Sequence, residues 1–155
     1  MIKIMFVCLG NICRSPMAEL ILKDYVHKAH MDDQFVIASS ATNDYNVNRG
    51  VGSYVYPPAR EILAEHGIST NGKRAQVLKP SDYHNYDLII GMDVGNYHDI
   101  VRICGGDPEH KIHLLMDYTK YRHEIADPYF TGDFKQAYKD ISEGCQALFN
   151  YLTNT

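Results

Sequence analysis

Short apolar runs alternate with segments of helical periodicity along the chain, beginning at its first residues. Residues 2–7 are mostly apolar β-formers, and apolar side chains recur three and four positions apart over residues 18–29. This pattern predicts a strand, a tight loop and a helix. We expect Ser15 to be the N-cap of that helix, Pro16 to occupy its first position and Glu19 to lie near the positive end of its dipole.

The same alternation repeats through the rest of the chain. Gly67 and Gly105-Gly106 are expected to end two of the later helices, and Asp93 to cap the start of the second of these. The segment from Thr42 to Pro58 is expected to be a long polar loop. The pattern predicts further strands at residues 35–39, 87–91 and 112–116, and further helices at residues 59–66, 94–104 and 134–152.

Strands that alternate with helices predict an α/β fold: a four-stranded parallel sheet with helices on both faces, the doubly wound arrangement. With 155 residues, 45% of them apolar, the chain is long enough for one well-packed domain and too short for two of ordinary size. We therefore expect residues 1–155 to form one domain. Ligands bind such sheets beyond the carboxyl ends of the strands, where the loop of residues 8–15 is expected to lie.

Charge and cysteine content limit the classes of function. A net charge of −4 provides no general basic field for nucleic acid or an anionic membrane, so any anion site must be local. No apolar run reaches the roughly 18 residues of a membrane span. The four cysteines include no Cys-x-x-Cys pair, which argues against a zinc site or a disulfide scaffold. We expect a cytoplasmic protein with reduced thiols that binds neither nucleic acid nor membranes.

The candidate chemistry is concentrated in the loop after the first strand. A loop that curls from a strand into a helix N-terminus turns backbone N–H groups inward and forms a cradle for phosphate. Arg14 can donate to two phosphate oxygens, while the inward donors stabilise a thiolate at Cys8, an in-line nucleophile beneath the phosphate. Gly10 and Asn11 tolerate the left-handed conformations of such a curl. Their presence after Cys8 disfavours the alternative that Cys8 is only a buried structural residue. The expected phosphate-binding loop is Cys8, Leu9, Gly10, Asn11, Ile12, Cys13, Arg14 and Ser15.

This loop, together with the flanking Val7 and Pro16, resembles the signature loop of the low-molecular-weight protein tyrosine phosphatases. The similarity extends over nearly the whole chain, through Ser39-Ser40-Ala41, His66-Gly67-Ile68, Met92-Asp93 and Asp127-Pro128-Tyr129. The resemblance implies a single flavodoxin-like domain that hydrolyses phosphotyrosine in proteins or peptides, with no metal and no cofactor. It also implies these roles: Cys8 as nucleophile, Arg14 as phosphate clamp, Ser15 as hydroxyl donor to the thiolate, Asn11 as loop organiser and Asp127 as general acid.

Asp127 also has an argument of its own. A carboxylic acid that protonates a leaving phenolate can then, as carboxylate, activate water against the phosphocysteine. Pro128 favours an extended conformation at Asp127. Asp-Pro is also an ordinary turn pair, however, and Asp107-Pro108 is a second example with no expected chemistry. The neighbouring Tyr129 and Phe130 favour the catalytic interpretation, because aromatic walls suit an aryl phosphate.

The expected substrate pocket consists of Ile12, Tyr45, Tyr129 and Phe130. Tyr45 could instead be a solvent-exposed loop tyrosine. Two departures from the family pattern fall near this pocket: Ala41-Thr42 stands where Ala-Gly is common, and Tyr56-Pro57-Pro58 stands where the family has Asp-Pro-Arg. These departures concern substrate recognition rather than catalysis.

Three other functions share parts of this pattern. Protein arginine phosphatases of the same fold have a threonine where this chain has Ile12. Arsenate reductases of the fold need two further relay cysteines, whereas Cys104 and Cys145 fall on apolar helical stripes and are expected in the core. A non-catalytic phosphate-binding module would lose the nucleophile or the acid.

The remaining candidates are of lesser weight. Cys13 could form a reversible disulfide with Cys8 that protects the nucleophile from over-oxidation, which the resemblance supports. His110 and His113 have metal-like spacing but no evident third ligand, so we expect no metal. Lys73-Arg74 is expected to be a solvated pair of loop charges that could attract acidic phosphopeptides. We expect a monomer with a rate optimum on the acidic side of neutrality, because the thiolate must be ionised while the acid is protonated.

Overall fold

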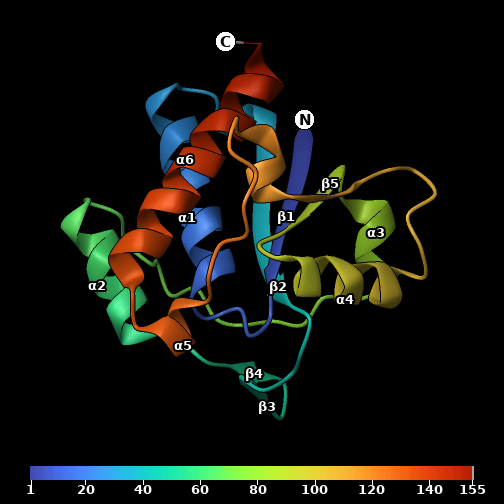
Figure 1. Ribbon diagram of the computed structural model, residues 1–155, viewed down its shortest axis with the longest axis horizontal. Helices are drawn as coiled ribbons and strands as arrows, with labels where there is room; N and C mark the ends of the chain where they lie inside the picture. Colours follow the sequence, from blue (N-terminus) through green and yellow to red (C-terminus); the bar gives the residue numbers. More distant parts are fainter. Residues whose placement is uncertain (155) are drawn as a thin grey trace.

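A parallel four-stranded sheet forms the centre of the computed structural model, which describes residues 1–154 (Figure 1). The strands lie in the order β2-β1-β5-β6, and all neighbouring pairs are parallel. Their order along the sheet differs from their order in the sequence because helical crossovers connect them. The bounds are Ile2–Cys8 for β1, Phe35–Ala41 for β2, Leu88–Gly91 for β5 and Ile112–Leu114 for β6.

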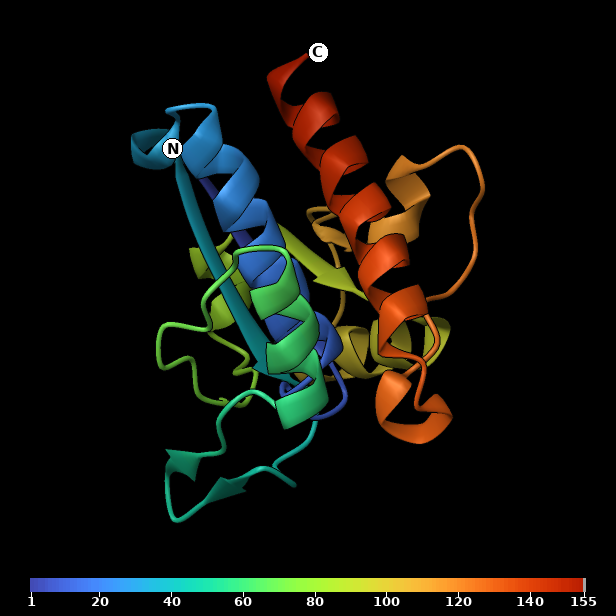
Figure 2. The ribbon, with the colours of Figure 1, turned by 90° about the vertical axis from the view of Figure 1, so that its left-hand side faces the viewer.

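Helices cover both faces of the sheet, which confirms the doubly wound arrangement. Three long helices pack on one face, and Figure 2 shows α1 and α6 side by side there. The other face is covered by two helices. The first group is α1 (Arg14–Lys28), α2 (Pro57–Glu65) and α6 (Phe134–Thr153), and the second is α3 (Asp82–Asn85) and α4 (Val94–Cys104).

The apolar run of β1 explains this burial on both sides. Ile4 and Phe6 point into the larger apolar cluster with α1, α2 and α6, whereas Met5 and Val7 point into the smaller cluster beneath α4. Successive side chains of a strand face opposite sides, so a continuous apolar run is the pattern that a central strand requires. All four side chains are at most 2% exposed.

The predicted helix boundaries at α2 and α4 are confirmed where a specific residue determines them. Asp93 caps α4, because its carboxylate accepts a hydrogen bond of 2.7 Å from the backbone N–H of Asn96. Gly105 ends α4 in a left-handed conformation, with φ of 77°. Gly67 has φ of 76° just beyond α2.

Several predicted boundaries are wrong. β2 continues past residue 39 to Ala41, and β5 begins at Leu88 rather than Asp87. The fourth strand ends at Leu114, where a 3₁₀-helix over Leu115–Tyr118 replaces its expected last residues. These differences arise because a strand ends where its pairing with neighbouring strands ends. The apolar pattern of the strand itself does not show where that is.

The segment from Thr42 to Pro58 is not a single polar loop. It contains a small antiparallel hairpin of β3 (Val47–Asn48) and β4 (Val51–Gly52), and α2 begins within it at Pro57. Positive φ angles at Arg49 (52°) and Gly50 (78°) form the turn that joins the two strands. Strands of two residues are too short for a period of two to be recognised in the sequence.

Two further short elements complete the fold, a 3₁₀-helix at Asp32–Gln34 and the helix α5 at Pro128–Thr131. Within residues 1–154, no helix is both long enough and apolar enough to cross a membrane. β1 and β5 end side by side at Cys8 and Gly91, so their carboxyl ends open at one edge of the sheet. The loop after β1 begins at this edge.

Candidate active site

Cys8 is the last residue of β1, and its thiol is surrounded by hydrogen-bond donors. The backbone N–H groups of Asn11 and Ser15 point at its Sγ from 3.3 and 3.4 Å, and the hydroxyl of Ser15 lies 3.0 Å from the same atom. The side chain is buried. Cys8 thus lies among converging hydrogen-bond donors, the environment in which proteins place nucleophilic cysteines.

The start of α1 differs from the prediction, and the difference places a hydroxyl at the thiol. The helix begins at Arg14 with Cys13 in the N-cap position, where no side chain caps it. Ser15 is therefore the second helical residue and not the N-cap, and Pro16 is the third rather than the first. Because the helix begins two residues closer to Cys8 than expected, the Ser15 hydroxyl contacts the thiol instead of capping the helix.

Asn11 organises the curl of the loop. Its φ of 56° confirms the predicted left-handed conformation. Its side-chain amide donates to the hydroxyl oxygens of Ser15 at 2.7 Å and Ser39 at 3.0 Å, and its Oδ1 accepts from the backbone N–H of Gln76 at 3.0 Å. One buried side chain thus links the loop to β2 and to the segment that follows α2.

The segment of residues 42–56 holds the outer side of the loop. Three loop carbonyls face this segment, so the N–H groups between them are free to face the interior of the cradle. Two of the donors are backbone N–H groups and the third is a side-chain amide. The bonds are from Thr42 N to Cys8 O (2.9 Å), from Asn46 Nδ2 to Gly10 O (3.0 Å) and from Tyr56 N to Ile12 O (2.9 Å).

Arg14 is only 2% exposed and is held by acceptors on two later loops. Its Nη1 donates to Asp93 at 2.6 Å and to the carbonyl of Ile125 at 2.8 Å, and its Nη2 donates to Asp127 at 3.3 Å. Burial alone would lower the pKa of Arg14, but the charges of Cys8, Asp93 and Asp127 raise it above its ordinary value. The guanidinium is therefore a fixed positive charge beside the cradle.

Asp127 lies at the start of α5 and shares Arg14 with Asp93. Its Oδ1 accepts from the backbone N–H of Tyr129 at 3.1 Å, so the carboxylate caps the short helix while Oδ2 faces the guanidinium. Its backbone is extended, with φ of −76° and ψ of 111°, as expected before Pro128. One-fifth of the side chain remains accessible. This arrangement leaves a carboxyl group at the mouth of the phosphate cradle.

Cys13 and Cys8 are both free thiols, although they occupy one loop. Burial, followed by the neighbouring charge of Cys8, raises the pKa of Cys13 to about 12. Cys13 therefore stays protonated at neutral pH.

Glu19 lies in the second turn of α1 and is not near the helix start as predicted. It is 5% exposed and accepts a hydrogen bond of 2.6 Å from the Ser39 hydroxyl. Lys23 contacts its other oxygen at 2.6 Å, and Lys73 lies 3.3 Å from the first. A buried carboxylate requires such partners, so Glu19 serves the interior behind the phosphate loop rather than the helix dipole.

The prediction of a solvated pair of charges is wrong for Lys73, whereas Arg74 is exposed as expected. The Lys73 side chain is 12% exposed, and its ammonium also donates to the carbonyl of Ser39 at 3.0 Å. Burial lowers the pKa of Lys73, and the Glu19 charge opposes that shift. Arg74 lies over the ring of Tyr54, 4.0 Å from its centroid, and donates to the carbonyl of Gly52 at 3.2 Å. Both side chains thus have structural partners.

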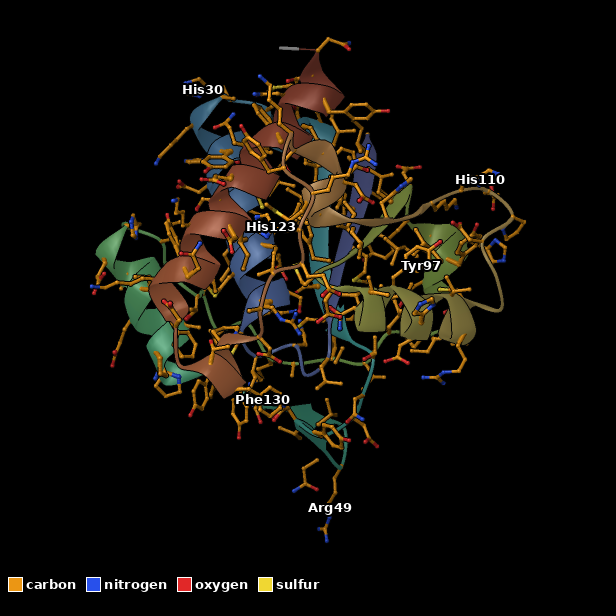
Figure 3. The ribbon with its side chains drawn as sticks, in the orientation of Figure 1. His30, Arg49, Tyr97, His110, His123 and Phe130 are labelled. Atoms are coloured by element: carbon orange, nitrogen blue, oxygen red, sulfur yellow. The ribbon has the colours of Figure 1, made fainter. Side chains whose placement is uncertain are left out.

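A cavity of about 350 Å³ opens above the loop. It contains every residue predicted for the substrate pocket, and three of its aromatic side chains are largely exposed at the rim: Tyr45 by 75%, Tyr129 by 53% and Phe130 by 73%. Figure 3 shows Phe130 at the same end of the molecule as Arg49 of the β3–β4 hairpin. The lining consists of residues 8–14 together with Tyr45, Asn46, Asp127, Tyr129 and Phe130.

Four residues of the site were not assigned from the sequence. Asp93 was expected only to cap α4, yet its second oxygen holds Arg14. Gln76 and Asn46 act through hydrogen bonds to the loop, and no local pattern distinguishes them from other polar loop residues. Tyr56 was singled out only as a departure from a family pattern.

The other singled-out residues lie outside the cavity. Cys145 is fully buried as predicted, whereas Cys104 is only partly buried. His113 contacts the carbonyl of His110 at 3.0 Å through its ring, and Figure 3 shows His110 far from Phe130. Across residues 1–154, no group of three His, Cys, Asp or Glu side chains is arranged to hold a metal ion.

Comparison with known proteins gives a family match over nearly the whole chain. The sequence model of the family described as low molecular weight phosphotyrosine protein phosphatase matches residues 3–155. The chain is 34% identical over 150 residues to the low molecular weight protein-tyrosine-phosphatase YfkJ of Bacillus subtilis, with 96% of this chain and 94% of the relative covered. It is 38% identical over 154 residues to the low molecular weight phosphotyrosine protein phosphatase of Sus scrofa, with coverage of 94% and 92%.

Solved structures agree with the sequence relatives. The crystal structure of YfkJ matches 99% of this chain and 96% of its own, with a TM-score of 0.93 at 33% identity. The crystal structure of DARP, a drosophila arginine phosphatase, matches 97% of this chain and 98% of its own, with a TM-score of 0.86 at 32% identity. Because the family model spans nearly the whole sequence and the fold is shared in full, the chain belongs to the low-molecular-weight protein tyrosine phosphatase family.

Proposed function

We propose that this protein hydrolyses phosphotyrosine in proteins or peptides through a phosphocysteine formed on Cys8. In the first step the Cys8 thiolate attacks phosphorus, the bond from phosphorus to the phenolic oxygen breaks, and Asp127 gives its proton to the leaving phenolate. In the second step Asp127 takes a proton from water as the water oxygen attacks phosphorus. The phosphorus–sulfur bond breaks, which releases phosphate and restores the thiolate.

The observation that carries this proposal is that three hydrogen-bond donors converge on the Cys8 sulfur. All three belong to the loop that forms the cradle. Arg14 is positioned to neutralise the oxygens of the transferring phosphoryl group. Its guanidinium also contacts Asp93 and Asp127. A phosphate bound in the cradle would contact the same guanidinium as these two carboxylates. Asp127 would then lie near the phenolic oxygen of the leaving group.

The shape of the cavity favours an aryl substrate. Phosphotyrosine needs walls that are flat and apolar, and Tyr45, Tyr129 and Phe130 supply aromatic surfaces at the rim. Ile12 adds an apolar surface within the loop itself. The apolar Ile12, in place of a polar threonine, favours an aromatic ring over a guanidinium, so we assign phosphotyrosine rather than phosphoarginine, although one structural relative is named an arginine phosphatase.

The arsenate reductase alternative is disfavoured by the positions of the other cysteines. Cys145 is fully buried, its thiol faces the carbonyl of Ala18 at 3.6 Å, and burial raises its pKa. A thiol that remains protonated and enclosed does not relay a disulfide outward. We expect the protein to act on phosphotyrosine proteins as a cytoplasmic monomer, with residues 1–155 as its single domain.

Hydrolysis of matched peptides tests the proposal. One peptide sequence carrying phosphotyrosine, phosphoserine or phosphoarginine is incubated with the wild type and with Cys8→Ser. We expect release of phosphate from the phosphotyrosine peptide alone and its loss in Cys8→Ser, together with a ³²P-labelled protein intermediate in rapid quench of the wild type. Preference for phosphoarginine, or undiminished hydrolysis by Cys8→Ser, would overturn the assignment.

A further inference from the structure

Tyr56 connects the phosphate loop to the segment that carries Asp127. Its backbone N–H donates to the carbonyl of Ile12 at 2.9 Å, which joins it to the loop. It stands at the N-cap of α2, and its own carbonyl accepts from the N–H of Arg60 at 3.0 Å in the first helical turn. The backbone of Tyr56 is therefore fixed from both sides.

The ring of Tyr56 reaches the segment on the opposite side of the cavity. Its centroid lies 5.2 Å from that of Tyr129 at an interplanar angle of 61°, and 6.1 Å from that of Phe134 at 24°. Tyr129 belongs to α5 and Phe134 is the first residue of α6. The half-buried ring is thus packed against both helices that follow the candidate acid, and such aromatic pairs attract each other beyond the burial of their area.

In the short helix α5, Pro128 is buried, and the ring of Tyr129 packs against that of Tyr56. The helix contains four residues, of which Tyr129 and Phe130 are exposed by more than half. Asp127 caps this helix through the N–H of Tyr129, so a displacement of Tyr129 displaces the carboxylate as well. Arg14 is the other group that holds the Asp127 side chain. Arg14 binds substrate phosphate in the proposed function, and the Tyr56 contact is independent of substrate.

We propose that Tyr56 is a positioning residue for the general acid: its ring holds α5 so that Asp127 is aimed at the leaving-group oxygen above the phosphate loop. This inference rests on the proposed roles of Cys8 and Asp127. Because Arg14 also holds Asp127, loss of the Tyr56 ring weakens proton donation without abolishing it. The departure from the family pattern at this position thereby has an effect on the acid step and not only on recognition.

Leaving-group dependence tests this role, because a general acid matters most when the leaving phenolate is strongly basic. We would compare kcat/KM for phenyl phosphate with kcat/KM for p-nitrophenyl phosphate, whose phenolate leaves readily without a proton. Tyr56→Ala is expected to lower the first value about tenfold and the second about twofold. Tyr56→Phe keeps the ring and is expected to restore both values. Tyr56→Leu provides an apolar replacement if the alanine variant does not fold.

Two reference variants make the outcome decisive. Asp127→Asn is expected to show the same substrate discrimination as Tyr56→Ala, but larger. Tyr54→Ala removes an exposed ring of the same segment that contacts Arg74 and not α5, and it is expected to leave both values unchanged. The pH profile supplies a second readout: the fall of kcat/KM for phenyl phosphate on the alkaline side should become shallower in Tyr56→Ala.

Each contrary result has a distinct meaning. If Asp127→Asn discriminates between the substrates while Tyr56→Ala lowers both rates by one factor or by none, the positioning role of Tyr56 is wrong and the proposed function stands. If Asp127→Asn shows no discrimination, the assignment of the acid fails and the role of Tyr56 falls with it. Failure of Tyr56→Phe to restore activity would also refute a role that depends on the ring.

Discussion

The side-chain amide of Asn11 donates to the hydroxyl oxygen of Ser15 at 2.7 Å, and this bond fixes the direction of the next one. Asn11 cannot present its carbonyl oxygen there, because that oxygen accepts from the N–H of Gln76 at 3.0 Å. The Ser15 oxygen is thus an acceptor toward Asn11. Its own hydrogen is left for Cys8 at 3.0 Å, nearer than the carbonyl of Ser40 at 3.4 Å. A thiolate can only accept a hydrogen bond. The direction of this bond, from the Ser15 hydroxyl to the sulfur, therefore suits Cys8 as the proposed nucleophile.

Ser15→Ala is expected to lower kcat/KM about 10- to 100-fold, because a hydrogen bond to a charged group contributes about 1.5–3 kcal/mol. The rate of alkylation of Cys8 by iodoacetamide below neutral pH should fall in parallel, since the sulfur has lost its hydroxyl donor. Ser40→Ala is the matched control, because the Ser40 hydroxyl is buried and has no hydrogen-bond partner among residues 1–154. Alkylation of Ser15→Ala at the wild-type rate would contradict the role of the hydroxyl.

The charge pair behind the loop should be strongly coupled. Glu19→Gln leaves the mostly buried Lys73 without a full negative partner, and Lys73→Met leaves Glu19 with Lys23 as its remaining cationic partner. Each single variant is expected to lose about 3 kcal/mol of unfolding free energy, whereas the double variant should lose clearly less than the sum. Urea unfolding of the four proteins measures this difference. Additive losses would mean that the two charges do not stabilise one another.

Stability should fall on the alkaline side through Cys13. Its pKa is about 12 in the folded state and 9.0 by the ordinary value, so both states hold the proton below pH 9. Above pH 9 the unfolded chain releases the proton and the folded chain keeps it, which favours unfolding by up to about 1.4 kcal/mol per pH unit until the pH reaches the folded pKa.

Urea unfolding between about pH 8 and about pH 10.5 measures this slope. Cys13→Ala should decline less steeply with pH than the wild type, whatever its stability at neutral pH. Equal slopes for the two proteins would contradict this prediction. They would mean that Cys13 loses its proton over this pH range in both states or in neither.

Gly52→Ala is expected to displace the hairpin. A Cβ at this position would lie 1.8 Å from the backbone carbonyl oxygen of Ala75, which cannot move aside as a flexible side chain can. We expect a loss of about 2 kcal/mol in unfolding free energy and a raised KM, because Tyr45 and Asn46 of the same segment line the cavity. Ser53→Ala, at the next position, serves as control and should change neither quantity. A Gly52→Ala protein with the wild-type KM would mean that the cavity is independent of the hairpin.

The layers of the fold and the phosphate loop could be predicted from the sequence because their signals are local. The apolar run of β1 and the helical period of α6 each lie within one segment, and Cys8 to Ser15 is contiguous. The partners of that loop are not local. Gln76 and Asn46 contact loop residues that lie more than 30 positions away in the chain, and only the tertiary fold brings them together. Ser15 illustrates a different limit, because a hydroxyl at a helix start suits both an N-cap and a thiol donor, and the path of the backbone selects one of them.

The hold of residues 42–56 on the loop carbonyls has a consequence for how this enzyme can diverge. Two of the three donors are backbone amides, which every residue except proline provides, and Asn46 is the one position whose side chain is required. Substitutions and insertions at the hairpin tip around Arg49 can therefore change the surroundings of the cavity without altering the cradle beneath it. Changes within residues 42–56 can therefore alter which partners the protein binds without altering how it cleaves the phosphate bond.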